Sequence, residues 1–373
     1  MVREILGHFA IRRRFGRLRC RLECIWSPPE NKVKEIWVIE RKKILTGITT
    51  SGTPHLGNMV GAILPAIEAS KENGVSSFLF LADYHSLIKS QDPELTHDSS
   101  FEVAAAWLAC GLKPEEVTFY RQSDVPEILE LAWSLSCVTA KGLMNRAHAY
   151  KAATSQNSDH GISDLDKGIS MGLFNYPVLM AADILAFNAE QVPVGHDQKQ
   201  HIEMTRDIAA RFNHLYGDVF NLPEAIISSK TGILPGTDGR KMSKSYNNTI
   251  PIFLGEKALL KAIRKIKTNS LEPGVPKESR DCTVFQLHRA FASKTQSDEM
   301  ENRYREGIAW GEAKDILFSL VNEKIEPFRQ RYEVIKEDKS YLENVLVEGA
   351  VKARQEASKV LEKVRSSIGI RRF

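Results

Sequence analysis

The sequence predicts an α/β protein in which a parallel, doubly wound sheet is followed by a mainly helical C-terminal region. Short apolar, β-branched runs alternate with segments of helical periodicity between residues 44 and 137, and this alternation is typical of a parallel sheet covered by helices. After Ser245 the periodicity is strongly helical. The length of 373 residues suits two or three domains of about 100–200 residues each.

The expected elements follow one another in that order. Strands are predicted at residues 44–48, 75–82 and 117–120, and helices at residues 58–73, 101–110 and 128–137. Ser99 and Ser100 precede the second helix and are of the residue type that caps a helix N-terminus. Such a Rossmann-like sheet binds ligands beyond the carboxyl ends of its strands, near a switch in strand order.

Composition excludes several classes of protein. Charged residues make up 26% and hydrophobic residues 42% of the chain, which is ordinary globular usage and rules out collagen-like, coiled-coil and wholly disordered chains. No apolar run approaches the roughly 20 residues that span a bilayer, so no membrane association is expected. Five cysteines in this length argue against a disulfide framework. Cys20-x-x-x-Cys24 lacks a matching pair, so we expect no metal site, and a reducing, cytoplasmic location fits best.

The charge is unevenly distributed and marks an N-terminal extension at residues 1–43. This segment holds twelve Lys/Arg against five Asp/Glu, although the whole chain carries a net charge of only +4. A nucleic-acid-binding arm, an organellar presequence and a poorly ordered extension all fit, and the last is the commonest explanation. The remaining chain is predicted to divide into an α/β domain with a helical insertion at residues 44–250 and a helical domain at residues 251–373.

The loop after the first strand is the first candidate site. Thr49-Thr50-Ser51-Gly52 offers hydroxyl groups and an open backbone, and His55-Leu56-Gly57-Asn58 stands where a helix is expected to begin. Unpaired N–H groups and the positive dipole end at a helix N-terminus suit a phosphate. Gly57 would let a nucleotide approach the backbone, while His55 and Asn58 are hydrogen-bond donors. Alone, this pattern also fits an ordinary turn between strand and helix.

A second segment supports a phosphate site. Gly239-Arg240-Lys241-Met242-Ser243-Lys244-Ser245 places two lysines three residues apart among small and hydroxyl residues. Such a loop can bring two ammonium groups to a polyphosphate leaving group. The H-L-G-N segment followed about 190 residues later by K-M-S-K-S is similar to the signature pair of class I aminoacyl-tRNA synthetases.

A helix predicted at residues 176–185 carries a carboxylate within an apolar stripe. Pro177 is expected at its first position. Tyr176, Met180, Asp183 and Phe187 are spaced to share one helical face, where an unpaired Asp183 would be costly. An indole N–H is one possible partner; a partly exposed carboxylate or an internal salt bridge is the alternative.

From residue 44 to residue 370 the chain resembles bacterial-type tryptophanyl-tRNA synthetases. The resemblance rests on L-M-A-A-D-I-L (179–185), V-P-V-G-H-D-Q-K-Q-H (192–201) and T-R-D-I-A-A-R-F-N (205–213), together with the two signature segments. It implies that Asp183 accepts the indole N–H of tryptophan and that the G-x-D-Q segment contacts ATP and the tryptophan ammonium.

The same resemblance implies two sets of site residues. The implied ATP-binding residues are Thr49, Thr50, Ser51, Gly57, Asn58, Gly195, His196, Asp197, Ile233, Lys241, Met242, Ser243, Lys244 and Ser245. The implied tryptophan-binding residues are Leu45, His85, Tyr176, Met180, Asp183, Val192, Val194 and Gln198. Lys241, Lys244, His55 and Asn58 are the implied catalytic residues.

Three positions depart from the family pattern. Thr49 stands in place of the usual Gln, His196 in place of a common Glu, and Leu45 in place of a frequent Phe. A side-chain contact to ATP from Thr49 or His196 is therefore in doubt, whereas Asp183 and the two lysines match the pattern.

The resemblance implies that ATP, accompanied by Mg²⁺, activates L-tryptophan, which is then transferred to tRNA(Trp), and that the enzyme is a homodimer. Helical stretches at residues 256–267 and 345–368 carry basic faces, which include Lys257, Lys261, Lys352, Arg354, Lys359 and Arg365. These faces fit either tRNA phosphates or an ordinary solvated surface. Two other functions remain open: a tyrosyl-tRNA synthetase with the same signature pair, and a catalytically silent paralogue that binds RNA.

Overall fold

The computed structural model describes residues 41–50, 52–227 and 234–373. The predicted extension at residues 1–43 therefore lies almost entirely outside the described residues, as do Ser51 and Ile233. The described chain belongs to one compact unit, Glu40–Phe373, so a boundary at residue 250 stays a prediction. No helix among the described residues is long and apolar enough to cross a membrane.

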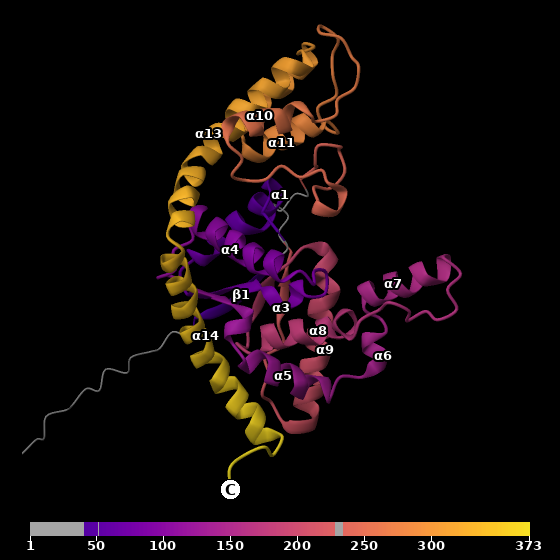
Figure 1. The fold of residues 1–373 in the computed structure, drawn as a ribbon, viewed down its shortest axis with the longest axis vertical. Helices are drawn as coiled ribbons and strands as arrows, with labels where there is room; N and C mark the ends of the chain where they lie inside the picture. The colour runs from indigo at the N-terminus through magenta and orange to yellow at the C-terminus, as the bar shows by residue number, and fades with distance from the viewer. Residues whose placement is uncertain (1–40, 51, 228–233) are drawn as a thin grey trace, which may run out of the picture. The chain divides into compact units, whose positions relative to one another are not determined.

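Five parallel strands form one sheet in the order β3-β2-β1-β4-β5 (Figure 1). They are β1 (Lys42–Thr49), β2 (Val75–Ala82), β3 (Thr118–Arg121), β4 (Gln191–Pro193) and β5 (Glu224–Ile226). The chain moves outward from β1 to β3 and then returns to the other side of β1 at β4. This reversal places the switch point between β1 and β4, and both signature segments of the predicted site lie near it.

Helices connect the strands and form the region after them. The first group is α1 (Leu56–Asn58), the π-helical turn η1 (Met59–Ile63), α2 (Leu64–Ser70), α3 (Asp83–Ser86), α4 (Pro93–Ala109), η2 (Gln122–Asp124), α5 (Glu127–Ser136), α6 (Lys141–Met144) and α7 (His148–Asp159). The second group is α8 (Met171–Leu185), η3 (His196–Gln198), α9 (Lys199–Tyr216), η4 (Lys244–Tyr246), α10 (Glu256–Arg264), α11 (Thr283–Phe291), α12 (Lys294–Arg305), α13 (Trp310–Glu337) and α14 (Lys339–Ser367). The predicted fold class, a Rossmann-like sheet followed by helices, is confirmed.

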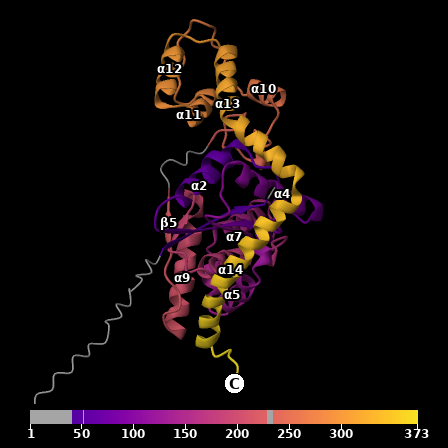
Figure 2. The same cartoon turned by 90° about the vertical axis from the view of Figure 1, so that its left-hand side faces the viewer.

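Both faces of the sheet are buried, which explains why its strands are almost continuously apolar. Successive side chains on a strand point to opposite faces. Leu79 and Leu81 of β2 therefore join a core with α2, α4 and the helices α10–α13. Phe78 and Phe80 join a second core with α5, α8 and α9. Figure 1 shows α8 and α9 running beside the sheet, and Figure 2 shows α9 beside β5.

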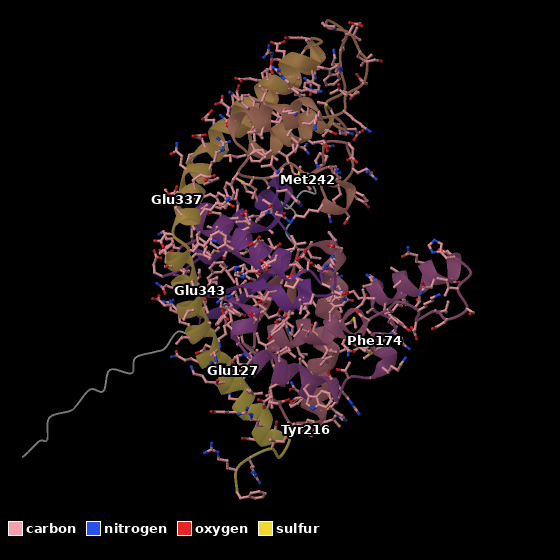
Figure 3. All side chains as sticks on the ribbon, viewed as in Figure 1. Glu127, Phe174, Tyr216, Met242, Glu337 and Glu343 are labelled. Atoms are coloured by element: carbon pink, nitrogen blue, oxygen red, sulfur yellow. The ribbon has the colours of Figure 1, made fainter. Side chains whose placement is uncertain are left out.

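The last helix, α14, packs along β3 and α5 (Figure 2). It approaches the strand so closely at Gly349 that an added Cβ would lie 1.7 Å from the carbonyl oxygen of Phe119. Four of its side chains also form ion pairs with residues outside the helix: Glu343 with Arg121, Arg354 with Glu127, Glu356 with Lys43, and Arg365 with Glu130. Glu127 and Glu343 are labelled in Figure 3. Arg354 and Arg365 therefore connect α14 to α5, and the RNA-binding face expected on this helix stays a prediction.

Two predicted helix starts are wrong. Helix α4 begins at Pro93, where the Asp92 side chain caps it by accepting a hydrogen bond from the Leu95 N–H, so Ser99 and Ser100 lie inside the helix. Helix α8 begins at Met171 after the cap residue Ser170, and Pro177 lies inside the helix. In both cases the preceding residue supplied the side-chain acceptor that a helix N-terminus needs.

Candidate active site

The two signature segments lie against each other beyond the carboxyl end of β1. The Leu56 N–H donates to the Ile250 carbonyl at 2.9 Å, and the Ile252 N–H donates to the Pro54 carbonyl at 3.1 Å. A Cβ added to Gly57 would lie 3.5 Å from Cβ of the buried Met242, which is labelled in Figure 3. Segments about 190 residues apart are thus joined by backbone hydrogen bonds and close packing.

His55 and Asn58 form a reciprocal cap at the start of α1. His55 Nδ1 accepts from the Asn58 N–H at 3.3 Å, and Asn58 Oδ1 accepts from the His55 N–H at 3.1 Å. Burial and the nearby Lys244 charge lower the pKa of His55 to about 4. His55 is therefore neutral near pH 7. Because Nδ1 accepts, the ring proton is on Nε2, which can donate to a phosphate oxygen.

One of the predicted ATP-binding residues in the loop after β1 faces the protein interior. Thr50 is buried, and its hydroxyl lies 2.8 Å from that of Ser86. Thr49 is exposed at the end of β1. The Gly52 N–H donates to Ser99 Oγ at 2.7 Å, so α4 holds the turn that follows.

Lys244 links this loop to the second signature segment. Its Nζ donates to the Gly52 carbonyl at 2.7 Å, and desolvation of the ammonium lowers its pKa to about 8. Lys241, Lys244 and Ser245 are exposed, and Ser243 is partly buried. At least one of the two lysine ammonium groups therefore already lies beside the loop predicted to hold ATP.

Asn248 organises the lysine-bearing segment from within. It is buried, and its Oδ1 accepts from the Ser243 N–H at 2.8 Å. Its Nδ2 donates to Asp238 Oδ1 at 2.6 Å and to the Lys241 carbonyl at 3.0 Å. The hydrogen bond from Asn248 to Asp238, together with those from Arg240, lowers the pKa of Asp238 to about 2.

Asp183 lies at the centre of a second polar cluster and is 1% exposed. Its Oδ2 is 2.8 Å from His85 Nε2, and its Oδ1 accepts from Gln122 Nε2 at 2.7 Å. Burial raises the pKa of Asp183, and the hydrogen bonds from His85 and Gln122 oppose this shift. The internal partner left open by the sequence is therefore present, and each carboxylate oxygen keeps a second lone pair for a ligand donor.

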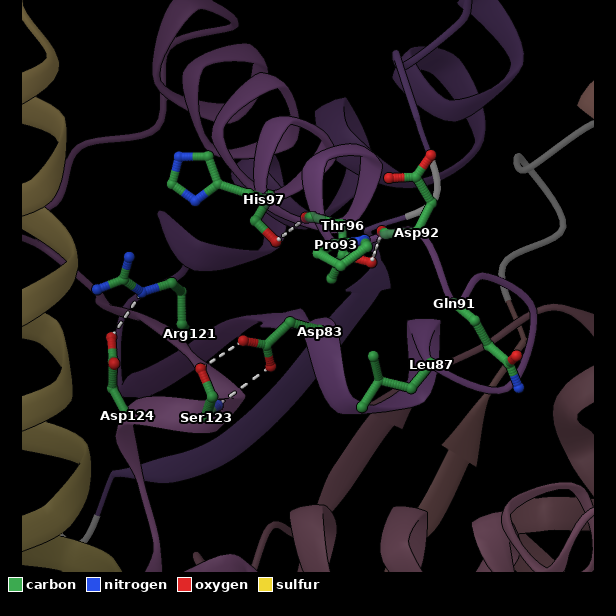
Figure 4. A pocket seen from close by; sticks show the side chains of 11 residues that line it. Asp83, Leu87, Gln91, Asp92, Pro93, Thr96, His97, Arg121, Ser123 and Asp124 are labelled. Carbon is green, nitrogen blue, oxygen red and sulfur yellow. Dashed lines mark hydrogen bonds and ion pairs between the residues drawn. The ribbon is translucent and has the colours of Figure 1, made fainter.

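A second layer of hydrogen bonds holds the two partners of Asp183. The Asp83 carboxylate accepts from the Ser123 hydroxyl and, at 3.1 Å, from the Ser123 N–H (Figure 4). Asp83 and Ser123 are close neighbours of His85 and Gln122 in the chain, so this contact fixes α3 against η2. The hollow of about 600 Å³ beside them is lined by Asp83, Ser123 and Arg121 but by no residue of either signature segment.

Tyr176, His201 and Gln198 form a chain of hydrogen bonds. The Tyr176 hydroxyl lies 2.7 Å from His201 Nε2, and His201 Nδ1 lies 2.7 Å from Gln198 Oε1. Gln198 ends the turn η3, which follows β4 and includes the exposed His196 and Asp197. A Cβ added to Gly195 would lie 2.6 Å from Asp197 Oδ1, so a larger residue here would require the exposed Asp197 side chain to move.

The apolar residues of the predicted tryptophan site lie between β1, β4 and α8. Leu45 and Val192 are buried, and Met180 and Val194 are partly buried against the same core. Gly47 is exposed although it lies in the central strand β1. It shares the strand face of Leu45, and a Cβ added to it would lie 2.5 Å from the Phe80 ring, so the close approach of this ring requires glycine.

Four residues of these clusters were missed by the sequence interpretation: Gly47, Gln122, His201 and Asn248. Gln122 comes two residues after the strand predicted at residues 117–120, and a polar side chain at the carboxyl end of a parallel strand is a recognisable signal. Gly47 interrupts an apolar strand, which is a signal for close approach of a neighbour. His201 lies within a segment that matches the family, and Asn248 lies three residues after another. Nothing in the sequence distinguishes these two residues from their neighbours, so only their contacts in the structure show their role. Among the described residues, no group of three or more His, Cys, Asp and Glu side chains is placed to hold a metal ion.

The fold and the paired segments define the class of protein, and comparisons with known proteins agree. Residues 40–325 match the family described as tRNA synthetases class I (W and Y). The chain is 53% identical over 333 residues to the tryptophan–tRNA ligase of Neisseria meningitidis serogroup A, covering 89% of this chain and 99% of the relative. It is 55% identical over 331 residues to the tryptophan–tRNA ligase of Xylella fastidiosa, covering 88% of this chain and 76% of the relative. This chain therefore belongs to the tryptophanyl-tRNA synthetase family.

A solved structure is similar over the same extent. Tryptophanyl-tRNA synthetase from Campylobacter jejuni, in complex with ADP and tryptophan, superposes with a TM-score of 0.78 at 42% sequence identity, covering 88% of this chain and 99% of that chain. The predicted family is thus confirmed, whereas the individual ligand contacts stay predictions.

Proposed function

We propose that this protein is a tryptophan–tRNA ligase. It activates L-tryptophan with ATP to tryptophanyl-adenylate, releases pyrophosphate, and transfers the amino acid to the terminal adenosine of tRNA(Trp). The observation that carries the proposal is the contact between the two signature segments at the carboxyl end of β1, where Lys244 Nζ reaches the Gly52 carbonyl. The 53% identity to a tryptophan–tRNA ligase supports the choice of amino acid.

In the first step the tryptophan carboxylate attacks the α-phosphorus of ATP. The carboxylate is already ionised, so no general base is needed, and catalysis consists of orientation and stabilisation of charge. Lys241 and Lys244 supply positive charge to the departing pyrophosphate. His55 adds a neutral donor at Nε2, and Gly57 allows the nucleotide to approach the start of α1. We propose that Mg²⁺ arrives with ATP, where it adds positive charge to the phosphates.

Tryptophan is proposed to lie with its indole over Gly47 and its N–H toward Asp183. His85 and Gln122 already donate to this carboxylate, so it is held in one orientation, and these two bonds favour its charged form against the burial that raises its pKa. Tyr176 and Gln198 lie beside the tryptophan ammonium, and Leu45, Met180, Val192 and Val194 supply apolar contacts. In the second step a ribose hydroxyl of the tRNA terminal adenosine, by class I membership the 2′-OH, attacks the activated carbonyl.

The test is ATP–pyrophosphate exchange with each of the twenty amino acids. We expect exchange with tryptophan alone. Exchange with tyrosine instead would establish the tyrosyl alternative, and no exchange with any amino acid would establish the catalytically silent paralogue. Either result would contradict the proposal.

We further propose that the helices after residue 250 bind tRNA(Trp), including its anticodon, and that the protein acts in the cytoplasm. On α10, Leu259 and Ile263 are buried while Lys257, Lys261 and Arg264 are exposed. This exposed basic face suits tRNA phosphates. Arg264 of this face pairs with Asp315 of α13 at 3.2 Å, just as Arg354 and Arg365 of α14 pair with glutamates of α5, so both helices remain candidates for contact with tRNA.

We expect a homodimer, with Trp133 of α5 at its interface. Trp133 is 73% exposed, and Leu129, one helical turn away, is 41% exposed. Adjacent exposed apolar side chains favour a protein contact, and a second copy of the chain is the expected partner. Light scattering should give about twice the monomer mass of 42.0 kDa, and Trp133→Asp should shift it toward the monomer. Val334→Asp, at a position 68% exposed on α13, is the matched control.

A parent protein that is fully active at a monomeric mass would contradict the dimer. A Trp133→Asp protein that stays dimeric would show that the interface lies elsewhere.

A further inference from the structure

His201 is a buried histidine that touches two residues of the proposed tryptophan site. It lies on α9, is 4% exposed, and stands between Tyr176 of α8 and Gln198 of η3. Its backbone carbonyl also accepts from the Thr205 hydroxyl at 2.8 Å. Its ring therefore has two short polar contacts, both to side chains expected beside the ligand.

The donors and acceptors in this chain can be assigned. Gln198 Oε1 has no proton, so His201 Nδ1 must donate to it. The amide orientation is supported by Gln198 Nε2, which lies 3.4 Å from Asp197 Oδ2. In a neutral ring the other nitrogen accepts, so Tyr176 donates its hydroxyl proton to His201 Nε2. The Tyr176 oxygen then keeps only lone pairs for a ligand.

We propose that neutral His201 is a positioning residue that makes Tyr176 a hydrogen-bond acceptor for the ammonium group of the amino-acid substrate. This inference rests on the proposed function and adds the selection of an α-ammonium group to it. A protonated His201 would donate from Nε2 to Tyr176, and the tyrosine hydroxyl proton would then point toward the ammonium. His201 thus acts through Tyr176 without touching the substrate.

The surroundings of His201 favour its neutral form. Burial lowers the pKa of His201, and the charges of His148 and His85 act in the same direction, while Asp197 opposes them. These groups and Tyr176 come from α7, α3, η3 and α8, the elements that face the ring. As the pH falls through the pKa of His201, tryptophan binding should weaken, whereas binding of ligands without an ammonium should not.

The experiment compares tryptophan with indole-3-propionate, which keeps the indole and carboxylate but lacks the ammonium. In His201→Leu we expect the KM for tryptophan to rise by about 10- to 150-fold, the factor contributed by a hydrogen bond to a charged group. The inhibition constant of indole-3-propionate and the KM for ATP should stay nearly unchanged. His214→Leu, an exposed position on the same helix, is the matched control.

His201→Gln separates positioning from folding. A glutamine amide can accept from Tyr176 and donate to Gln198, and it does not titrate near neutral pH. We expect it to restore the KM for tryptophan and to remove the weakening at low pH. Equal loss of tryptophan and indole-3-propionate binding in His201→Leu, or an unchanged KM for tryptophan, would overturn the inference. A parent protein that activates no tryptophan would overturn the proposed function and this inference together, whereas the variants alone decide the role of His201.

Discussion

Replacement of Lys244 by alanine is expected to slow tryptophanyl-adenylate formation by about 10²–10³-fold, the usual effect of removing one group that stabilises transition-state charge. Negative charge develops on the leaving pyrophosphate, and Lys244 Nζ lies 2.7 Å from the Gly52 carbonyl in the loop expected to hold ATP. The indole and ammonium groups of tryptophan are expected on the side of the reacting carboxylate that faces away from the pyrophosphate. The KM for tryptophan should therefore change little, and single-turnover pyrophosphate release should show the loss.

Lys257→Ala is the matched control, because Lys257 is an exposed lysine on α10 and pyrophosphate exchange does not involve tRNA. The pH profile gives a second readout. The pKa of Lys244 is about 8, so its charge is present below this pH and lost above it. The kcat/KM for ATP should fall as the pH rises through about 8, and Lys244→Ala should lack this decline. Equal exchange rates in variant and parent would remove Lys244 from the catalytic residues.

The sheet could be predicted because its signals are local. The run Val75–Ala82 is continuously apolar or small, and it forms β2 over the same residues. Helix starts were less predictable because two residues competed as caps. Ser99 stands closer to the apolar run of α4, yet Asp92, seven residues before Ser99, caps the helix, and Pro93 follows it at the first position, where proline is favoured. Pro177 was likewise taken as a start, although α8 continues through it.

The site was predictable only where its signals are local in the sequence. Spacing alone placed Asp183 on an apolar helical face, and it is buried there. Its partners come from α3 and η2, 98 and 61 residues away, and no local pattern reports contacts over such distances. The basic residues of α14 show the same limit. Their spacing fits an RNA-binding face, which stays a prediction, while the pairing of Arg354 and Arg365 with Glu127 and Glu130 depends on how α5 packs and could not be predicted from local sequence.

The discrimination against an analogue without the indole N–H is expected to be the largest effect in this protein. We expect the parent to prefer tryptophan by about 10⁴–10⁵-fold in kcat/KM over the analogue whose ring nitrogen is replaced by sulfur, because a site built to accept a hydrogen bond rejects ligands that lack the donor. Asp183 is 1% exposed, so water cannot replace the missing donor.

Asp183→Asn tests whether this carboxylate makes that discrimination. The variant keeps one oxygen and the side-chain volume but loses the charge. Gln122 can turn its amide, since Oε1 has no hydrogen-bond partner among the described residues, and accept from the amide group that the substitution introduces. The protein should therefore fold, while the KM for tryptophan rises by about 10-fold or more, the contribution of a charged acceptor, and the KM for ATP changes little. Asp207→Asn, an exposed position on α9, is the control.

The decisive measurement is the ratio of kcat/KM for tryptophan to that for the sulfur analogue, in parent and variant. The ratio should fall in Asp183→Asn because a neutral amide can no longer attract the indole N–H as strongly, and the analogue should lose little. The Asp207→Asn ratio should equal that of the parent. If the parent activates both ligands with equal efficiency, Asp183 does not read the indole, and its hydrogen bonds to His85 and Gln122 serve only to hold α8 against α3 and η2.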